Sequence, residues 1–73
     1  MFYDYAKIKI VKKLIEFGED VYLHYSEEYH SADSYCERKA REAIRASLDG
    51  AKKIYDSSVK DEIYDWVCYE LFG

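Results

Sequence analysis

The chain of 73 residues contains no proline and only three glycines. Because proline removes a backbone donor and clashes with the preceding helical turn, its absence leaves long helices free to form. No apolar run approaches the roughly 18 residues that a membrane span requires. The first ten residues carry the acidic Asp4 and no small-residue cleavage site follows them, which is unlike a secretory signal. We therefore expect a cytoplasmic protein.

Cysteine and histidine are also scarce, and their spacing predicts no metal site and no cofactor. Cys36 and Cys68 match neither a C-x-x-C motif nor a disulfide scaffold, so we interpret them as buried thiols. His24 and His30 are six residues apart, as are His30 and Cys36. On a helix this offset points the two side chains to opposite faces, whereas structural zinc ligands pair at about two to five residues.

Enzymatic chemistry is not indicated either. A nucleophile needs a base and an orienting group beside it, and no spacing places a cysteine next to a histidine. A chain this short forms at most one domain and builds no deep pocket alone. We expect residues 1–73 to form a single small helical domain that is not an enzyme.

Hydrophobic periodicity predicts helices over most of the chain. Residues 4–18 carry two neighbouring apolar stripes opposite a lysine-rich face, with Asp4 as the N-cap and Gly18 just after the last turn. A second apolar face runs from Cys36 to Tyr55, and its phase continues through Gly50, so we predict one helix there.

Capping patterns mark the start of two of these helices. Asp33 or Ser34 can cap the helix that carries Cys36, and Ser34 with Glu37 makes a capping box. The last helix is predicted over residues 57–73, with Ser58 and Asp61 as its capping pattern. Its inward-facing residues are predicted to be Val59, Ile63, Trp66 and Val67.

Residues 21–30, with the sequence VYLHYSEEYH, fit two structures. In a helix, Tyr22, Tyr25 and Tyr29 share one face, but Leu23 lies off that face. In a strand, Leu23 falls on the apolar side, but residues 7–11 are the only candidate for the neighbouring strand. We favour the helix, and with it an all-α bundle of three to four helices. The alternative is an α+β fold with an N-terminal hairpin and two helices.

Tyrosine is over-represented, with nine residues, and it coincides with acid in two segments. Tyrosine gives a large contact area at a low entropy cost, and the surrounding charges steer a partner of opposite sign. We therefore predict a protein partner with a basic surface. The predicted contact residues are Tyr22, Tyr25, Glu27, Glu28 and Tyr29, with Asp61, Glu62, Asp65 and Tyr69 as a second set.

Two alternatives remain open. Arg38, Arg41 and Arg45 resemble a nucleic-acid recognition helix in outline, which would make the chain a small nucleic-acid-binding regulator. Acidic residues share that helix face, and the net charge of −4 has the wrong sign for attracting phosphate. A further alternative is a structural helper that acts by oligomerising, for example as a homodimer.

In size, acidity and tyrosine content the whole chain resembles the small proteins that phages and mobile elements encode. Some of these, including anti-CRISPR and DNA-mimic inhibitors, block host nucleic-acid enzymes. The resemblance implies an inhibitor in the host cytoplasm that binds a basic surface of a nucleic-acid-handling protein. It implies no catalytic residue and no cofactor.

Overall fold

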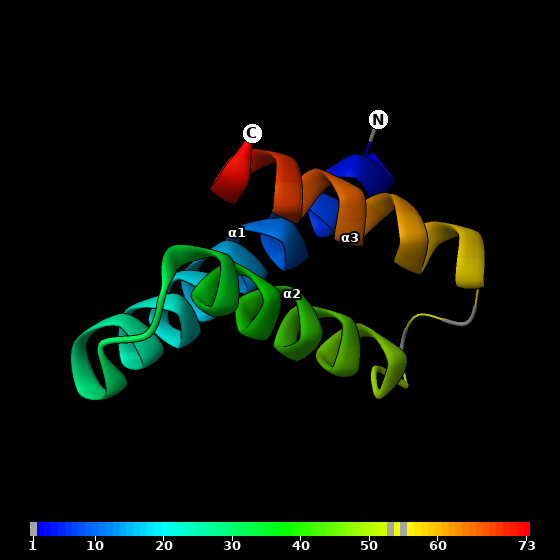
Figure 1. Ribbon diagram of the computed structural model, residues 1–73. Helices are drawn as coiled ribbons and strands as arrows, with labels where there is room; N and C mark the ends of the chain where they lie inside the picture. The colour runs from blue at the N-terminus through cyan, green and yellow to red at the C-terminus, as the bar shows by residue number, and fades with distance from the viewer. Residues whose placement is uncertain (1, 53, 55) are drawn as a thin grey trace.

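The computed structural model describes residues 2–52, 54 and 56–73, with their side chains from Ala6 onward. Three α-helices form: α1 (Phe2–Leu23), α2 (Asp33–Asp49) and α3 (Ser57–Phe72). A π-helical segment, η1 (His24–Glu28), continues α1 without a break (Figure 1). The described residues contain no strand, so the all-α prediction is confirmed and the alternative with a hairpin is not supported.

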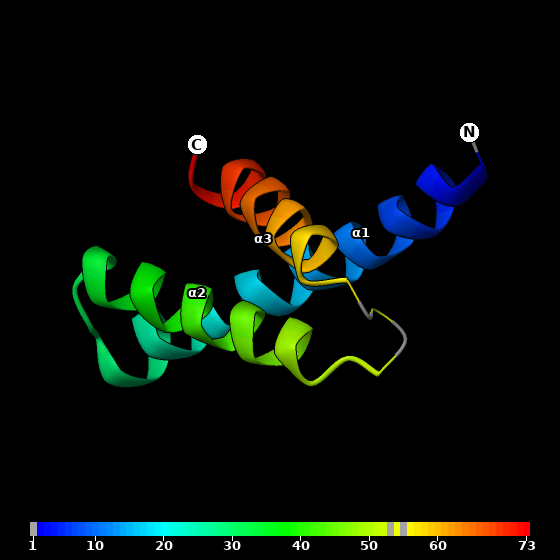
Figure 2. The same ribbon diagram turned by 90° about the vertical axis from the view of Figure 1, so that its right-hand side faces the viewer.

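The helices α1 and α2 form an antiparallel pair, and α3 packs across both of them. The connection from α1 to α2 projects beyond the end of α3, at the lower left in Figure 1, and Figure 2 shows the same projection from the side. The molecule is consequently elongated, with extents of 41 × 20 × 16 Å. Within the described ranges, no helix is both long enough and apolar enough to cross a membrane.

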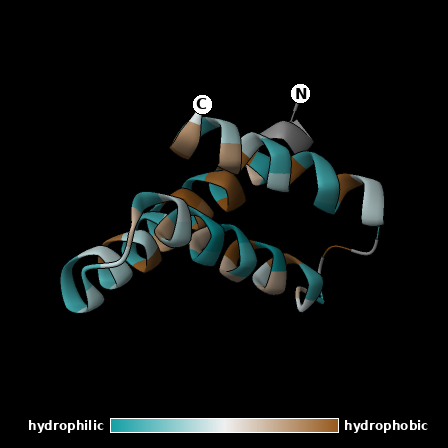
Figure 3. Ribbon diagram, viewed as in Figure 1, coloured by the Kyte–Doolittle hydropathy of each residue, from teal (hydrophilic) through white to brown (hydrophobic). Residues whose placement is uncertain are grey.

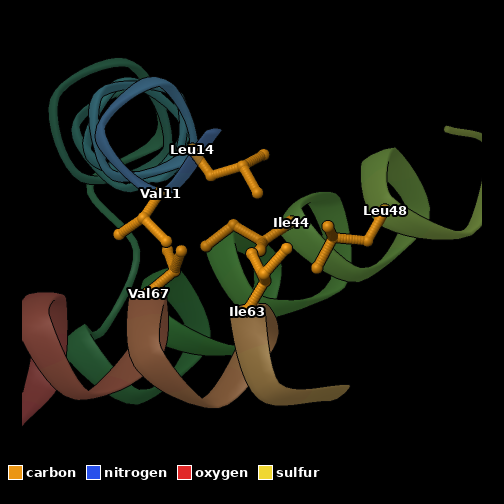
Figure 4. Close-up of a cluster of buried hydrophobic side chains, with 6 residues drawn as sticks. All are labelled: Val11, Leu14, Ile44, Leu48, Ile63 and Val67. Atoms are coloured by element: carbon orange, nitrogen blue, oxygen red, sulfur yellow. The ribbon is translucent and has the colours of Figure 1, made fainter. Parts of the chain in front are cut away.

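One hydrophobic cluster joins the three helices. Each helix contributes two side chains that point toward the others: Val11, Leu14, Ile44, Leu48, Ile63 and Val67 (Figure 4). The predicted apolar faces of α2 and α3 supply four of these six, which confirms the phase of both helices. In Figure 3 each of the three helices carries hydrophobic segments among hydrophilic ones, whereas the projecting connection is mostly hydrophilic.

Gly18 does not end the first helix, contrary to the sequence-based prediction. A Cβ atom on Gly18 would lie 2.7 Å from both Ile44 Cδ1 and Leu71 Cδ1. Glycine at this position allows α1, α2 and α3 to approach closely in mid-helix. The predicted start was also wrong, because α1 begins at Phe2 and so includes Asp4.

Gly50 ends α2, so the prediction of one helix through to Tyr55 was wrong. The Gly50 N–H donates to the Ala46 carbonyl, and the Ala51 N–H donates to the Leu48 carbonyl at 3.1 Å, which tightens the last turn. Tyr55 itself lies outside the described residues.

The N-cap residues of α2 and α3 also differ from the predicted ones. Ala32 occupies the N-cap position of α2 and makes no side-chain cap hydrogen bond, so neither Asp33 nor Ser34 is the cap. Asp56 caps α3, because its Oδ1 accepts hydrogen bonds from the Ser58 N–H at 2.9 Å and the Ser58 hydroxyl at 2.7 Å. These bonds lower the pKa of Asp56, the side-chain bond most strongly.

Candidate protein-binding surface

Four aromatic rings gather at the projecting end of the molecule. The His24 ring lies edge-on to Tyr25 and Tyr29, with 5.3 Å between ring centroids in both pairs. Tyr25 in turn lies 5.5 Å from Tyr29 and 5.7 Å from Tyr35 on α2. We call this cluster, together with Glu27 and Glu28, the tyrosine tip.

The π-helical geometry of η1 brings these rings together. An α-helix separates residues five apart by about 140° around its axis. The wider turn of a π-helix, with its i→i+5 bonds, reduces that separation, so His24 and Tyr29 can meet. His30 then adopts a left-handed conformation with φ of 50°, and the Ser31 N–H donates to the Tyr25 carbonyl. The chain thereby turns into α2 with the rings held on one side.

The tip presents aromatic surface to solvent. Tyr29 is 64% exposed and Tyr35 is 38% exposed. Together with Tyr25 they line an open groove of about 480 Å³. Adjacent exposed aromatic rings of this kind are typical of a surface that contacts another molecule.

The tip is also acidic. From Ile15 to Glu37 the chain carries seven carboxylates and no lysine or arginine. Glu27 and Glu28 are exposed, and neither forms an ion pair with another described residue. Among the described residues, arginine and lysine approach the tip from α2, where Arg38 and Lys39 lie 5.3 and 5.5 Å from the centre of the Tyr35 ring. The outer side of the tip therefore has a negative field.

Tyr22, also predicted as a contact residue, lies apart from the tip groove. Its hydroxyl donates to Asp33 Oδ1 at 3.0 Å, and its ring lies 6.2 Å from that of Phe72. The hydrogen bond to Asp33 raises the pKa of Tyr22. Tyr22 thus joins α1 to the start of α2 and the end of α3, beside a second open groove of about 580 Å³ that it lines with Glu19 and Leu23.

Two residues of the second predicted set form ion pairs between helices. Asp61 Oδ1 lies 2.7 Å from Arg45 Nη1, and Glu62 Oε2 lies 3.1 Å from Lys7 Nζ. The hydrogen bond to Asp61 raises the pKa of Arg45. These carboxylates hold α3 against α2 and α1, so part of their charge is neutralised within the molecule.

Asp65 and Tyr69 remain on the outer face of α3. Tyr69 is 70% exposed, and Asp65 is exposed without an ion pair to another described residue. Glu62 of the second set is far from the tyrosine tip. Glu62 lies beside Lys7, which is about 27 Å from Tyr25 along the helix at 1.5 Å per residue.

The arginine face of α2 is neutralised within the protein. Arg38 pairs with Glu42, Arg41 with Glu37, and Arg45 with Asp49 as well as Asp61. Arg41 also lies 5.0 Å from the centre of the Phe72 ring. Burial opposes the charge of Arg41, but hydrogen bonds to Glu37 and Tyr64 outweigh it and raise its pKa. This arrangement favours a structural role for the arginines over phosphate contact.

The two cysteines are buried and not disulfide-bonded. Cys36 Sγ lies 3.6 Å from the Ser31 carbonyl oxygen, and burial raises the pKa of the Cys68 thiol. The raised pKa of Cys68 lowers the fraction of its thiolate, the form that a nucleophile needs. Among the described residues, no three His, Cys, Asp or Glu side chains gather closely enough to hold a metal ion.

Comparison of the chain with protein-family models, with curated proteins and with solved structures finds no match in any of the three. A functional proposal for this protein therefore rests on the chemistry and geometry of the tyrosine tip.

Proposed function

We propose that the protein is a non-enzymatic binding module whose tyrosine tip docks on a basic surface of another protein. The observation that carries the proposal is that an exposed Tyr29 lies beside Glu27 and Glu28 at one projecting end, where both carboxylates are exposed and neither pairs with another described residue. The preferred partner is a nucleic-acid-handling protein, because such proteins present basic grooves that suit this surface.

The physical argument combines two contributions. Tyrosine is enriched among the few residues that supply most of the binding energy in protein interfaces. An arginine or lysine of the partner can lie over the face of Tyr25 or Tyr29 and pair with Glu27 or Glu28 at the rim. Carboxylates around the anchor speed the encounter and align the two surfaces.

Occupation of a basic groove makes inhibition the expected consequence. A groove filled by the tip is unavailable to the phosphates that it normally binds, so the two ligands compete. The outer face of α3, with Asp65 and Tyr69, extends the contact if the groove is long. Asp61 and Glu62 contribute less, because ion pairs to Arg45 and Lys7 already engage them.

Capture of a partner from host lysate tests the proposal. Tagged wild-type protein is incubated with lysate, with and without nuclease treatment, and the bound proteins are identified by mass spectrometry. We expect a basic protein that Glu27→Lys/Glu28→Lys no longer retains. A matched variant with the same change in charge, Glu16→Lys/Glu70→Lys, replaces two exposed carboxylates outside the predicted contact residues and should retain most of it.

Two outcomes would contradict the proposal. In one, the same proteins bind the tip variant and the wild type while circular dichroism shows that both are folded. In the other, the captured proteins disappear on nuclease treatment, and binding depends on Arg38 and Arg41. The second outcome would support the nucleic-acid-binding alternative.

A further inference from the structure

An apolar groove lies between α1 and the end of α2, away from the tyrosine tip. Ile10 and Leu14 form one wall, and Leu48, Ala51 and Ile54 form the other. The groove has a volume of about 390 Å³, within the range of about 300–1,000 Å³ that ligand-binding pockets span. Its floor is part of the hydrophobic core, since Leu14 and Leu48 are buried.

Lysines surround this groove. Lys13 and Lys52 lie on its rim and form no ion pair with a described residue. From Lys7 to Lys13 the chain has four lysines and no carboxylate. The molecule is therefore electrically polar along its length, with a basic apolar groove toward one end and the acidic tip at the other.

We propose that the occupant of the groove is the tyrosine tip of a second copy of this chain. The exposed ring of Tyr29 enters the apolar groove, while Glu27 and Glu28 approach Lys13 and Lys52. The tip matches the groove in two respects: its tyrosine ring suits the apolar lining, and its two carboxylates suit the two lysines. This inference goes beyond the proposed function, because it concerns self-association and requires no external partner.

The tip and the groove of one molecule cannot meet each other. The helix α2 separates them, and its 17 residues span about 25 Å at 1.5 Å per residue. Two copies placed antiparallel satisfy both contacts at once, and such a pair has the two-fold symmetry that is commonest among oligomers. One tip in one groove buries little area, so the reciprocal pair is the arrangement that approaches a specific interface of about 1,000 Å².

Sedimentation equilibrium of the untagged full chain tests the inference. Between about 10 μM and about 1 mM protein, a weak interface populates monomer and dimer. We expect the average mass to rise from 8.7 kDa toward twice that value at low salt and to fall back at about 0.5 M salt, where screening is strong.

Charge reversal identifies the surfaces. Lys13→Glu/Lys52→Glu and Glu27→Lys/Glu28→Lys should each weaken association at least about tenfold. An equimolar mixture of the two variants should associate again, because every tip then meets a groove of opposite charge. The mixture separates this contact from a general effect of net charge.

Two matched pairs of single variants refine the test. Lys12→Glu makes the same charge change as Lys13→Glu on the neighbouring residue, which does not line the groove, and should weaken association less. Tyr29→Ala should weaken it more than Tyr69→Ala, although Tyr69 is the more exposed ring.

A wild-type chain that stays monomeric up to about 1 mM at low salt would overturn the inference, since even a weak dimer forms there. Association that persists in both reversed variants, or that the mixture fails to restore, would overturn it as well. The proposed function is tested independently of the dimer. Lys13→Glu/Lys52→Glu leaves the tip intact, so capture of an external partner by this variant does not depend on the dimer.

Discussion

Gly18 lies at the point where side chains from α2 and α3 reach the backbone of α1. An added methyl group there would collide with Ile44 and Leu71, whose terminal methyl groups lie 2.7 Å from the ideal Cβ position. Gly50 differs, because its φ of −84° suits any residue and a Cβ would make only ordinary contacts. A side chain is therefore sterically excluded at Gly18 but accommodated at Gly50, a difference that the sequence alone does not reveal.

Alanine substitutions at these two positions should therefore differ in sign. Gly18→Ala gains about 1 kcal/mol of helix propensity but overpacks the core at a cost of about 1–3 kcal/mol. We expect a net destabilisation of about 1 kcal/mol. Gly50→Ala should stabilise by about 0.5 kcal/mol, mainly by restricting the unfolded chain. Urea unfolding of both variants measures the difference, and a stabilised Gly18→Ala would contradict the close approach of the three helices.

At the scale of the helices, sequence periodicity predicts which faces are buried but not where each helix ends. Ile63 and Val67 of α3 were predicted to face inward, and both are buried. The position of a helix end depends instead on which nearby side chain caps the free backbone groups. Asp56, two residues before the predicted cap, has the side chain that reaches the Ser58 N–H, so α3 begins earlier than the Ser58 pattern predicts.

The contacts within the tip and the ion pairs between helices could be identified only from the three-dimensional structure. The π-helical segment spans five residues, too few to show a periodic pattern, so the contact of His24 with Tyr29 could not be predicted from the sequence. The pairing of Asp61 with Arg45 depends on how α3 crosses α2, which the separate helices do not determine. The clustering of Tyr25 and Tyr29 near carboxylates could be predicted, because these residues are close in sequence.

The start of α3 gives a pH-dependent prediction. The pKa of Asp56 is lowered below its ordinary value of 3.8, so its ionised form stabilises the folded state above that pH. As pH falls through the lowered pKa, this contribution is lost. Asp56→Ala should lower the melting temperature most at neutral pH, and the gap to wild type should close toward pH 2.

Thermal melts monitored by circular dichroism across this pH range provide the measurement. Ser57→Ala, on the exposed neighbouring residue, serves as the control and should change little at any pH. A gap that stays constant with pH would show that the effect of Asp56 does not come from its charge.

For the whole molecule, the separation of charge along the long axis is the main feature. The stretch from Ile15 to Glu37 lacks lysine and arginine, and the stretch from Lys7 to Lys13 lacks aspartate and glutamate. Both proposals use the acidic tip, so dimer formation and partner binding are mutually exclusive. Binding of a basic partner to the monomer would shift the equilibrium from dimer to monomer. The concentration of free tips would also depend on the total protein concentration.

Site-specific photo-crosslinking of the tip tests the central claim most directly. A photoreactive phenylalanine analogue replaces Tyr29 in one sample and Tyr69 in another, since both rings are largely exposed. Lys13→Glu/Lys52→Glu is present in both to remove the second copy as a target. We predict a nuclease-resistant crosslink to a basic protein from position 29, stronger than from position 69. Crosslinks from position 69 alone, or to nucleic acid, would contradict the account.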